Sequence, residues 1–447
     1  MVNKSFNVNL NHKIRPFKKT IKVDSDKSIS IRSLLIGAIC EDISKVKNIL
    51  ESEDVISTIK CLKKLGVKIE KKNGFYNIYG KGLGSLIAKK NTKLNFGNSG
   101  TLARLLIGLL TSNPNIELNV TGDKSLKKRS MKKLIQLMSK FGATFLSKKK
   151  IYFPLKIISS EMPVGFEYQA GISAQLKSAV LLAGLNSFGI TKIHEKDKSR
   201  DHTENMLLHN KKVIQVYNNK NKIIKINGKQ ILKSINVTIP GDPSASAFFS
   251  ALTILKKNSS IKIKNVGLNP TRIGFYNLLK KHGAKIRIEN INKNNNEIHG
   301  DINVINCELK PIIAPKKYYV NSTDEYPILF AMAALIKGTS VFKGVGDLAN
   351  KESNRIVEMQ KILKQINVQS KISKDTFKVF GRGVIDASSK TIYVPNLGDH
   401  RICMSAFVLA LLTGAKTKIK NFETVFTSSP SFLKIMKILG ARYEIQK

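Results

Sequence analysis

The stretch SISIRSLLIGAIC, residues 28–40, contains the pattern that organises the whole chain. It opens on a serine and continues as an apolar helix rich in small residues. Five more segments repeat it at successive intervals of 71, 74, 71, 80 and 75 residues: SGTLARLLIGLLTS from Ser99, SAQLKSAVLLAGL from Ser173, SASAFFSALTIL from Ser244, DEYPILFAMAALIKG from Asp324 and DHRICMSAFVLALLTG from Asp399. Such near-regular spacing predicts six repeated units of about 75 residues.

Each unit has a second half that predicts a strand, an amphipathic helix, a short break and another strand. SSIKIKNV after the fourth helix and TKIKNFE after the sixth are typical of the first strand. The break carries glycine in four units and asparagine in the third and fifth, at Gly66, Gly142, Gly283, Gly440, Asn210 and Asn367. We expect a left-handed residue to end the helix there, because Gly adopts that conformation freely and Asn tolerates it.

Six such units divide most simply into two α/β domains of three. IPGDPSAS, residues 239–246, combines Pro and Gly just before the fourth helix, which places the crossover near Pro240. The residues ahead of the first unit are assigned to the second half. The predicted domains are therefore 22–241, and 1–21 together with 242–447.

The net charge of +45 is extreme for a chain of 447 residues. A polyanion partner such as nucleic acid is one explanation. The other is codon bias, because Lys, Asn and Ile are all abundant, only 11 of the 76 basic residues are Arg, and the lysines are scattered along the chain. We favour codon bias and expect no nucleic-acid partner.

Several other classes of protein are disfavoured. The four cysteines, Cys40, Cys61, Cys307 and Cys403, do not lie at metal-ligand spacing, so no zinc site is expected, and lone thiols suit a reducing compartment. The N-terminal segment lacks the apolar core of a signal peptide, and no apolar run reaches the ~18 residues of a membrane helix. We expect a cytoplasmic protein with no membrane partner.

The helix starts predict where anions bind. N–H groups at the start of a helix are free and carry partial positive charge, which favours phosphate and carboxylate. Six arginines, whose planar fork suits oxyanions, lie at or beside these starts or in polar loops: Arg32, Arg104, Arg129, Arg200, Arg355 and Arg401. If the repeats have pseudo-three-fold symmetry, several starts face one cleft that traps anions. For Arg32 and Arg104, one turn into their helices, ordinary salt bridges are the alternative.

The chain resembles the EPSP synthase (5-enolpyruvylshikimate-3-phosphate synthase) family over essentially its full length. Seven segments carry the resemblance, each at the start of a repeat or in the following loop: DKSISIR (26–32), FGNSGTLARLL (96–106), GISAQLKSAVLLAGL (171–185), SRDHTE (199–204), DEYPILFAMAA (324–334), KESNR (351–355) and GDHRICMS (398–405). The resemblance implies a two-domain inside-out α/β barrel with its active site in the cleft between the domains. It also implies a monomer without metal or organic cofactor, which transfers the enolpyruvyl group of phosphoenolpyruvate to the 5-hydroxyl of 3-phosphoshikimate and releases phosphate.

The family's substrate contacts carry over residue by residue. For 3-phosphoshikimate the resemblance implies Lys27, Ser28, Arg32, Ser173, Ala174, Gln175, Arg200, Asp324 and Lys351. For phosphoenolpyruvate it implies Lys27, Asn98, Gly100, Arg129, Gln175, Arg355 and Arg401. Ala174 stands where some members have Ser, so only its backbone N–H can contribute. An ordinary N-cap is the alternative for Ser173, and both roles are compatible.

Asp324, Glu352 and Lys27 are the implied catalytic residues. The reaction deprotonates the 5-hydroxyl, protonates the methylene carbon and then reverses this proton traffic to expel phosphate. By resemblance Asp324 is the base toward the hydroxyl and Glu352 the donor to carbon, and the share of Lys27 is open. The residues alone also allow a helix cap for Asp324 and a surface ion pair for Glu352. A donating Glu352 needs a raised pKa, whereas adjacent cations lower it.

Three positions depart from the family pattern. Asn354 stands where Asp is common, Ser429 where an aromatic residue is usual, and Thr427 where many members have Lys, which puts an anion contact from that loop in doubt. Gly100 leaves more room than Ala, so we expect sensitivity to glyphosate, an inhibitor that resembles phosphoenolpyruvate.

Two rival functions follow from the sequence. UDP-N-acetylglucosamine enolpyruvyl transferase shares the fold and the donor but normally uses a loop cysteine, whereas Cys40 and Cys61 lie in or beside regular elements. An RNA-binding protein acting through its charge would need exposed aromatics among its basic residues, yet the aromatic content is 7% and Trp is absent.

Overall fold

The strands of the computed structural model, which describes residues 5–147, 150–218 and 221–447, form six four-stranded sheets. The chain divides into unit 1 (Met1–Asp24, Pro240–Asn292 and Ile298–Lys447) and unit 2 (Ser25–Ile239 and Lys293–Glu297). The segment Lys293–Glu297 departs from the predicted division, which placed all of 242–447 in one domain. It belongs to unit 2 because Asn295 donates to the backbone oxygen of Asn236, and Glu297 Oε1 lies 2.7 Å from His202 Nδ1.

Unit 2 contains three sheets of the same design. In strand order they are β14(Asn236–Thr238)-β3(Ile43–Lys47)-β5(Phe75–Tyr79)-β4(Lys68–Lys72), β6(Thr92–Asn95)-β7(Glu117–Thr121)-β9(Leu155–Ile158)-β8(Thr144–Leu146), and β10(Glu167–Ala170)-β11(Ile190–Glu195)-β13(Lys222–Asn227)-β12(Ile214–Asn218). In each sheet the first pair is parallel and the next two pairs are antiparallel. The shared pairing order shows that the sequence repeats are structural repeats.

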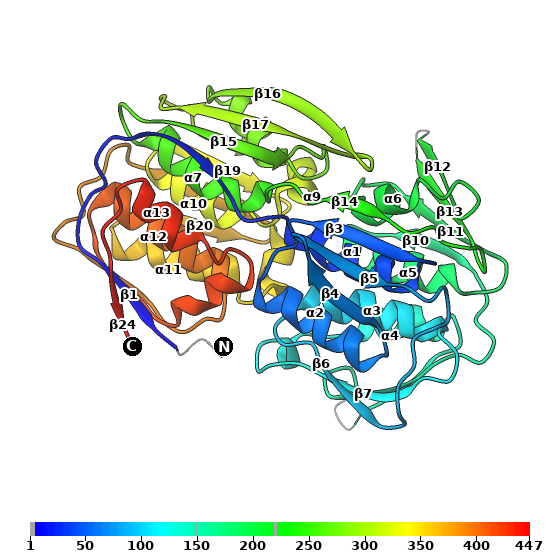
Figure 1. Ribbon diagram of the computed structural model, residues 1–447. Helices are drawn as coiled ribbons and strands as arrows, with labels where there is room; N and C mark the ends of the chain where they lie inside the picture. Colours follow the sequence, from blue (N-terminus) through cyan, green and yellow to red (C-terminus); the bar gives the residue numbers. More distant parts are fainter. Residues whose placement is uncertain (1–4, 148–149, 219–220) are drawn as a thin grey trace. The chain divides into compact units, whose positions relative to one another are not determined.

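Three helices fill the middle of unit 2, with the sheets around them (Figure 1). They are α1(Lys27–Ile39), α3(Gly100–Ser112) and α5(Ala174–Leu185). Every residue of α1 from Ile29 onward is buried, as is every residue of α5 from Leu176 onward. A helix that is apolar on all sides needs cover all round, and the sheets supply it from their alternating buried residues. The remaining helices are α2(Glu53–Lys64), α4(Lys132–Ser139), α6(His202–Leu207) and the 3₁₀ turn η1(Leu126–Lys128).

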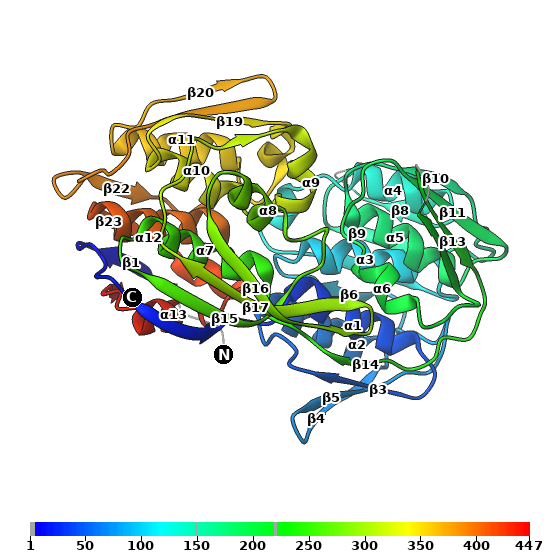
Figure 2. The ribbon, with the colours of Figure 1, turned by 90° about the horizontal axis from the view of Figure 1, so that it is seen from above.

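Unit 1 repeats this design. Its sheets, in strand order, are β22(Thr391–Val394)-β23(Lys416–Ile419)-β1(Asn7–Leu10)-β24(Glu444–Gln446), β18(Ile313–Ala314)-β19(Gly338–Lys343)-β21(Thr376–Gly381)-β20(Ser370–Ser373), and β16(Lys285–Asn294)-β17(Glu297–Ile305)-β15(Ser260–Gly267)-β2(Lys18–Lys22). The buried helices are α7(Pro243–Leu255), α10(Tyr326–Ala334) and α12(His400–Thr413). The other helical segments are α8(Gly274–Lys281), α9(Tyr319–Ser322), α11(Arg355–Gln365), α13(Phe432–Ile438), η2(Lys316–Tyr318), η3(Gly346–Asn350) and η4(Phe422–Thr427). The sheet of β15, β16 and β17 covers α7 and α10 in Figure 1, and Figure 2 views that sheet from above.

The predicted breaks between helix and strand are confirmed in five units. Gly66, Gly142, Gly283, Gly440 and Asn367 have φ values of 84°, 96°, 100°, 97° and 58°. The prediction for Asn210 is wrong, because Asn210 is not among the residues with positive φ. Its side chain instead accepts a hydrogen bond from Lys233 N at 3.0 Å.

A glycine brings two site-bearing helices together. A methyl group on Gly108 of α3 would lie 2.6 Å from the backbone oxygen of Ala179 in α5, so the two helices touch along their backbones. Any larger side chain would force them apart. This contact sets the start of α3, with Gly100, beside the start of α5, with Gln175.

Candidate active-site residues in each unit

Most of the predicted helix starts need only small corrections. Ser99, Ser173 and Asp399 are N-cap residues of α3, α5 and α12, as predicted. Helix α1 is capped by Asp26 rather than Ser28, and α7 by Asp242 rather than Ser244; their carboxylates accept from Ile29 N at 2.9 Å and from Ser244 N at 2.8 Å. Short acidic side chains are good N-caps, because they accept from the free N–H groups of the first turn. Lys27 and Ser28 therefore lie in the first turn of α1, not ahead of it.

Four residues predicted to bind phosphoenolpyruvate come together at the start of α3. Arg129 Nη2 donates to Asn98 Oδ1 at 2.5 Å, and a methyl group on Gly100 would lie 3.0 Å from Arg129 Nη1. Arg104 Nη1 joins the group by donating to Gly100 O at 3.0 Å and to Gln175 Oε1 at 2.9 Å. Arg104 was counted from the sequence among the arginines placed to bind anions, with an ordinary salt bridge as the alternative, but not among the substrate contacts. Its position one helical turn after Gly100 was the available signal.

Lys27 is linked to this group by the buried carboxylate of Asp54 and the partly exposed carboxyl of Asp123. Its Nζ is 3.0 Å from Asp54 Oδ2, and the two side chains are 17% and 6% exposed. Burial raises the pKa of the Asp123 carboxyl, Arg129 lowers it, and Asp54 adds to the rise. One acidic pair therefore faces both Lys27 and Arg129. Neither aspartate was identified from the sequence, because this pairing joins residues distant in the chain.

Arg32 is held in place by oxygen atoms from three segments. Its Nη1 donates to Ser28 O at 3.1 Å, its Nε to Thr203 Oγ1 at 2.9 Å, and its Nη2 to Ser178 Oγ at 3.0 Å. The arginine is only 3% exposed. These hydrogen bonds fix the orientation of the guanidinium group, and a fixed planar fork suits an anion-binding role.

The start of α5 brings Ser173, Ala174 and Gln175 together, all partly exposed. Ser173 Oγ accepts from Leu176 N at 3.4 Å, so the N-cap role is present, and it leaves the helix start facing outward. Gln175 Nε2 donates to Thr101 Oγ1 at 3.0 Å. Arg200, also partly exposed, lies in the loop between β11 and α6.

In unit 1 a buried arginine gathers three carboxylates. Arg355 Nε lies 2.9 Å from Asp399 Oδ2, Nη2 lies 2.6 Å from Glu352 Oε2, and Nη1 lies 3.5 Å from Asp324 Oδ1. The exposed fractions of the side chains are 1% for Arg355, 0% for Asp399, 20% for Glu352 and 24% for Asp324. Burial alone would lower the pKa of Arg355, but the three carboxylates raise it. Both predicted acid–base residues, Asp324 and Glu352, are therefore paired with one permanently charged side chain, which is also paired with the fully buried Asp399.

The structure shows how these carboxylates stand against the alternatives left open for them. Asp324 is not a helix cap, because α10 starts at Tyr326 and its N-cap residue is Glu325. Glu352 does form an ion pair, with Arg355, but a largely buried one. Asn354 caps α11, accepting from Val357 N at 3.3 Å, so this departure from the family pattern keeps the cap and loses only a charge.

Asp399 also links Arg401 to this network. Its Oδ1 accepts from Arg401 N at 3.0 Å, while the Arg401 guanidinium carbon lies 5.7 Å from the Phe248 ring centroid. Lys351 lies on the same loop as Glu352, with its Nζ 2.6 Å from Asp347 Oδ2. Asp399 was recognised from sequence only as a helix start.

The loop with Ser429 and Thr427 makes contacts within the protein. Ser429 Oγ and Ser431 N both donate to Asp24 Oδ2, at 2.9 and 3.0 Å. Thr427 Oγ1 donates to Thr424 O at 2.8 Å. This loop therefore holds the last residue of the first unit 1 segment, Asp24.

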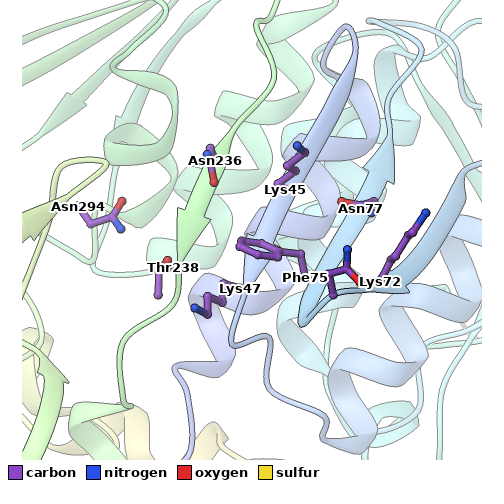
Figure 3. Close-up of a pocket in the computed structure, with 9 residues that line it drawn as sticks. Lys45, Lys47, Lys72, Phe75, Asn77, Asn236, Thr238 and Asn294 are labelled. Carbon is purple, nitrogen blue, oxygen red and sulfur yellow. The ribbon is translucent and has the colours of Figure 1, made fainter.

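An open groove of about 730 Å³ lies elsewhere in unit 2, over the outer face of the β14-β3-β5-β4 sheet (Figure 3). It is lined by Lys45, Lys47, Lys72, Asn73, Phe75, Asn77, Asn236, Thr238 and Asn294. Figure 3 shows the Phe75 ring pointing toward Lys47, whose Nζ is 5.6 Å from the ring centroid. This is the place where the RNA-binding rival would be tested. None of the predicted site residues lines it.

Cys40 and Cys61 do not match the loop cysteine of the UDP-N-acetylglucosamine rival. Burial raises the pKa of both the Cys40 and the Cys61 thiol to about 12, so neither is a thiolate at neutral pH. Within the described ranges, no three His, Cys, Asp or Glu side chains are grouped to hold a metal ion. In the same part of the chain, none of the helices has the length and apolar character needed to span a membrane.

Comparison with known proteins adds the family context. The family model for EPSP synthase (3-phosphoshikimate 1-carboxyvinyltransferase) matches residues 11–436. A 3-phosphoshikimate 1-carboxyvinyltransferase of Paramagnetospirillum magneticum is 36% identical over 431 residues, which is 96% of both chains.

Solved structures show the same relationship. The EPSP synthase of Acinetobacter baumannii superposes with a TM-score of 0.84 at 33% identity, covering 99% of this chain and 100% of the other. The enolpyruvyl transferase NikO of Streptomyces tendae has a TM-score of 0.75 at 12% identity and covers 99% of each chain, a likeness of fold alone.

Proposed function

The chain belongs to the EPSP synthase family, the 3-phosphoshikimate 1-carboxyvinyltransferases, and on that premise we propose that the two groups of residues described above bind the substrates of this reaction. It is a transferase that moves the enolpyruvyl group of phosphoenolpyruvate to the 5-hydroxyl of 3-phosphoshikimate and releases phosphate. The observation that carries the proposed chemistry is the Arg355 network, because it holds Asp324 and Glu352 on one buried charge.

The acceptor is assigned to the starts of α1 and α5. Both substrates are anions, and these starts offer free N–H groups beside cationic side chains. In this proposal 3-phosphoshikimate contacts Lys27, Ser28, Arg32, Ser173, Ala174, Gln175, Arg200, Asp324 and Lys351. Ser173 supplies a hydroxyl and Ala174 its backbone N–H, while Arg32 and Arg200 neutralise the carboxylate and the phosphate.

Phosphoenolpyruvate is assigned to the start of α3, with Asn98, Gly100, Arg129, Lys27 and Gln175. The absence of a side chain on Gly100 lets the guanidinium groups of Arg104 and Arg129 approach the backbone. Arg355 and Arg401 of unit 1 are the remaining ligands. Arg355 Nη1 makes no hydrogen bond to any described residue, and its charged partner Asp324 Oδ1 lies 3.5 Å away.

The proton transfers are assigned to the carboxylates on Arg355. Asp324 takes the proton of the 5-hydroxyl while the hydroxyl oxygen attacks C2 of phosphoenolpyruvate. Glu352 or Lys27 gives a proton to the methylene carbon. In the second step the methyl group returns a proton, the double bond forms again and the C–O bond to phosphate breaks. The proposal leaves the division between Glu352 and Lys27 to experiment.

We also propose the arrangement implied by the family: an inside-out α/β barrel in which two domains, corresponding to unit 2 and unit 1, close on the substrates. In this proposal acceptor binding drives closure, since like-charged arginines and helix starts repel until an anion lies between them. The enzyme would act as a cytoplasmic monomer, without cofactor and without nucleic acid.

Phosphate release measured with two acceptors tests the function. Phosphoenolpyruvate with 3-phosphoshikimate should release phosphate continuously, and UDP-N-acetylglucosamine in its place should give the rate of the acceptor-free blank. Turnover with UDP-N-acetylglucosamine as acceptor but not with 3-phosphoshikimate would show that the chain catalyses the rival reaction.

Replacing Gly100 with alanine should weaken the binding of both phosphoenolpyruvate and glyphosate. The new methyl group would lie 2.8 Å from Arg104 Nη1 and 3.0 Å from Arg129 Nη1, so both guanidinium groups must shift. We expect the KM for phosphoenolpyruvate and the inhibition constant of glyphosate to rise on the order of tenfold to a hundredfold, the effect of displacing binding groups by about 1 Å. The control is Gly171→Ala, whose methyl group meets no atom within 4 Å. Unchanged inhibition of the Gly100 variant would remove Arg104 and Arg129 from this site.

A further inference from the structure

Helix α5, whose start carries Ser173 and Gln175, contains a fully buried lysine. Lys177 is 0% exposed, and its Nζ lies 2.8 Å from Glu195 Oε1 and 2.7 Å from Glu204 Oε1. Lys222 Nζ completes the cluster, 3.5 Å from Glu195 Oε2 and 3.2 Å from Glu204 Oε1. Burial would raise the pKa of the Glu204 carboxyl, but Lys177 and Lys222 outweigh it and lower that pKa. Four buried charges cost more in desolvation than apolar side chains of equal volume, so stability alone does not account for the cluster.

The cluster fixes the residue just before Arg200. Glu195 ends β11, and its Oε1 accepts from Ser199 N at 2.9 Å and from Ser199 Oγ at 2.6 Å. Lys177 Nζ also lies 3.4 Å from Ser199 O. Three atoms of Ser199 are therefore held by Glu195 and Lys177. Because Arg200 is the next residue, these contacts fix the backbone from which its side chain extends. Helices α5 and α6 and strands β11 and β13, which carry the cluster, all lie in unit 2 (Figure 1).

The other end of the same loop fixes Arg32. Glu204, held by Lys177, follows Thr203 in α6. Thr203 Oγ1 donates to Ser178 Oγ at 2.8 Å and accepts from Arg32 Nε at 2.9 Å. Since Ser178 follows Lys177 in α5, two consecutive residues of one helix hold both ends of the segment 199–204.

We propose that Lys177 is a positioning residue for the acceptor: through Ser199 it sets Arg200, and through Glu204 and Thr203 it sets Arg32. This inference rests on the proposed function, in which Arg200 and Arg32 bind the phosphate and carboxylate of 3-phosphoshikimate. Lys177 touches no substrate, because its ammonium group is enclosed by the two glutamates and Ser199 O. The positioning role of Lys177 accounts for several residues of the SRDHTE segment. Ser199, Thr203 and Glu204 anchor the segment, and Arg200 contacts the ligand.

The first test is the pair of changes Lys177→Met and Glu204→Gln in one chain. Removing both leaves Lys222 opposite Glu195, so the cluster stays neutral and the volumes are nearly kept. We expect the KM for 3-phosphoshikimate to rise about tenfold to a hundredfold, while kcat and the KM for phosphoenolpyruvate change by about threefold or less. Calorimetric titration with 3-phosphoshikimate alone should show the same loss of affinity.

A second arm changes no charge and decides the matter if the first variant does not fold. Thr203→Val removes the hydroxyl that orients Arg32 and should also raise the acceptor KM about tenfold, whereas Thr203→Ser should stay within about twofold. The control is Thr191→Val in β11, a hydroxyl that is equally buried and has no hydrogen-bond partner among the described residues.

The outcomes separate the possible failures. An unchanged acceptor KM in the folded Thr203→Val variant, or an equal rise in the KM of both substrates, would overturn the positioning role. A wild-type chain that releases no phosphate with 3-phosphoshikimate would instead overturn the proposed function. A drop in kcat alone would also count against Lys177, because it would point to chemistry rather than acceptor placement.

Discussion

Asp324→Ala should bind both substrates and turn them over about 10²–10⁴-fold more slowly, the usual contribution of a positioned general base. The carboxylate lies 3.5 Å from Arg355 Nη1 and is 24% exposed, so it faces outward from its anchor. Its loss leaves Arg355 paired with Glu352 and Asp399, which should preserve the fold. Steady-state kinetics with phosphate release measures kcat, and calorimetry measures substrate affinity.

A second variant of Asp324 shows whether proton transfer matters or only the shape of the side chain, and a third variant elsewhere is its control. Asp324→Asn keeps the shape and a contact with Arg355 but cannot accept a proton, so its kcat should fall as far as that of the alanine variant. Asp386→Asn is the control, an exposed carboxylate paired with Lys13 at 3.2 Å, and should leave kcat unchanged. Near-normal turnover by Asp324→Asn would move the base to another residue.

Arg355→Met should cause the largest loss of stability, about 3–5 kcal/mol, because it leaves partners of a buried cation uncompensated. Asp399 suffers most, since its side chain is 0% exposed and its Oδ2 loses the bond to Arg355 Nε. Urea unfolding followed by circular dichroism would show the loss as a lower midpoint.

The matched control is Lys361→Met, which breaks an exposed pair with Glu358 at 2.8 Å and should cost about 1 kcal/mol or less. Adding Asp399→Asn to Arg355→Met should recover part of the lost stability, since the buried negative charge is then gone. An Arg355→Met protein that unfolds at the wild-type midpoint would mean that the three carboxylates do not depend on this arginine.

The repeat architecture was predictable because it follows from a local rule. A helix covered on all sides must be apolar on all sides, and the segments from Ser28, Ser99 and Ser173 have that character. The residues that end helices were predictable for the same reason, since Gly66 and Asn367 adopt left-handed conformations that few other residues accept. Asn210 shows the limit of such rules, because it does not have a positive φ and its side chain accepts a hydrogen bond from Lys233 N instead.

Long-range pairing escaped prediction. Asp54 of α2 pairs with Lys27 of α1, and Asp399 of the sixth repeat pairs with Arg355 of the fifth. No local spacing in the sequence predicts such contacts. Lys177 lies inside a segment that was noted for its repeat pattern and its resemblance, and its partners Glu195 and Glu204 follow 18 and 27 residues later.

Small-angle X-ray scattering tests most directly whether one chain closes its two units on the acceptor. The radius of gyration should fall when 3-phosphoshikimate saturates the protein and should not fall with phosphoenolpyruvate alone. Calorimetry under the same conditions would establish saturation. A radius of gyration that stays constant in the fully loaded protein would contradict a shared site formed by Lys27 and Arg129 of unit 2 with Asp324 and Arg401 of unit 1.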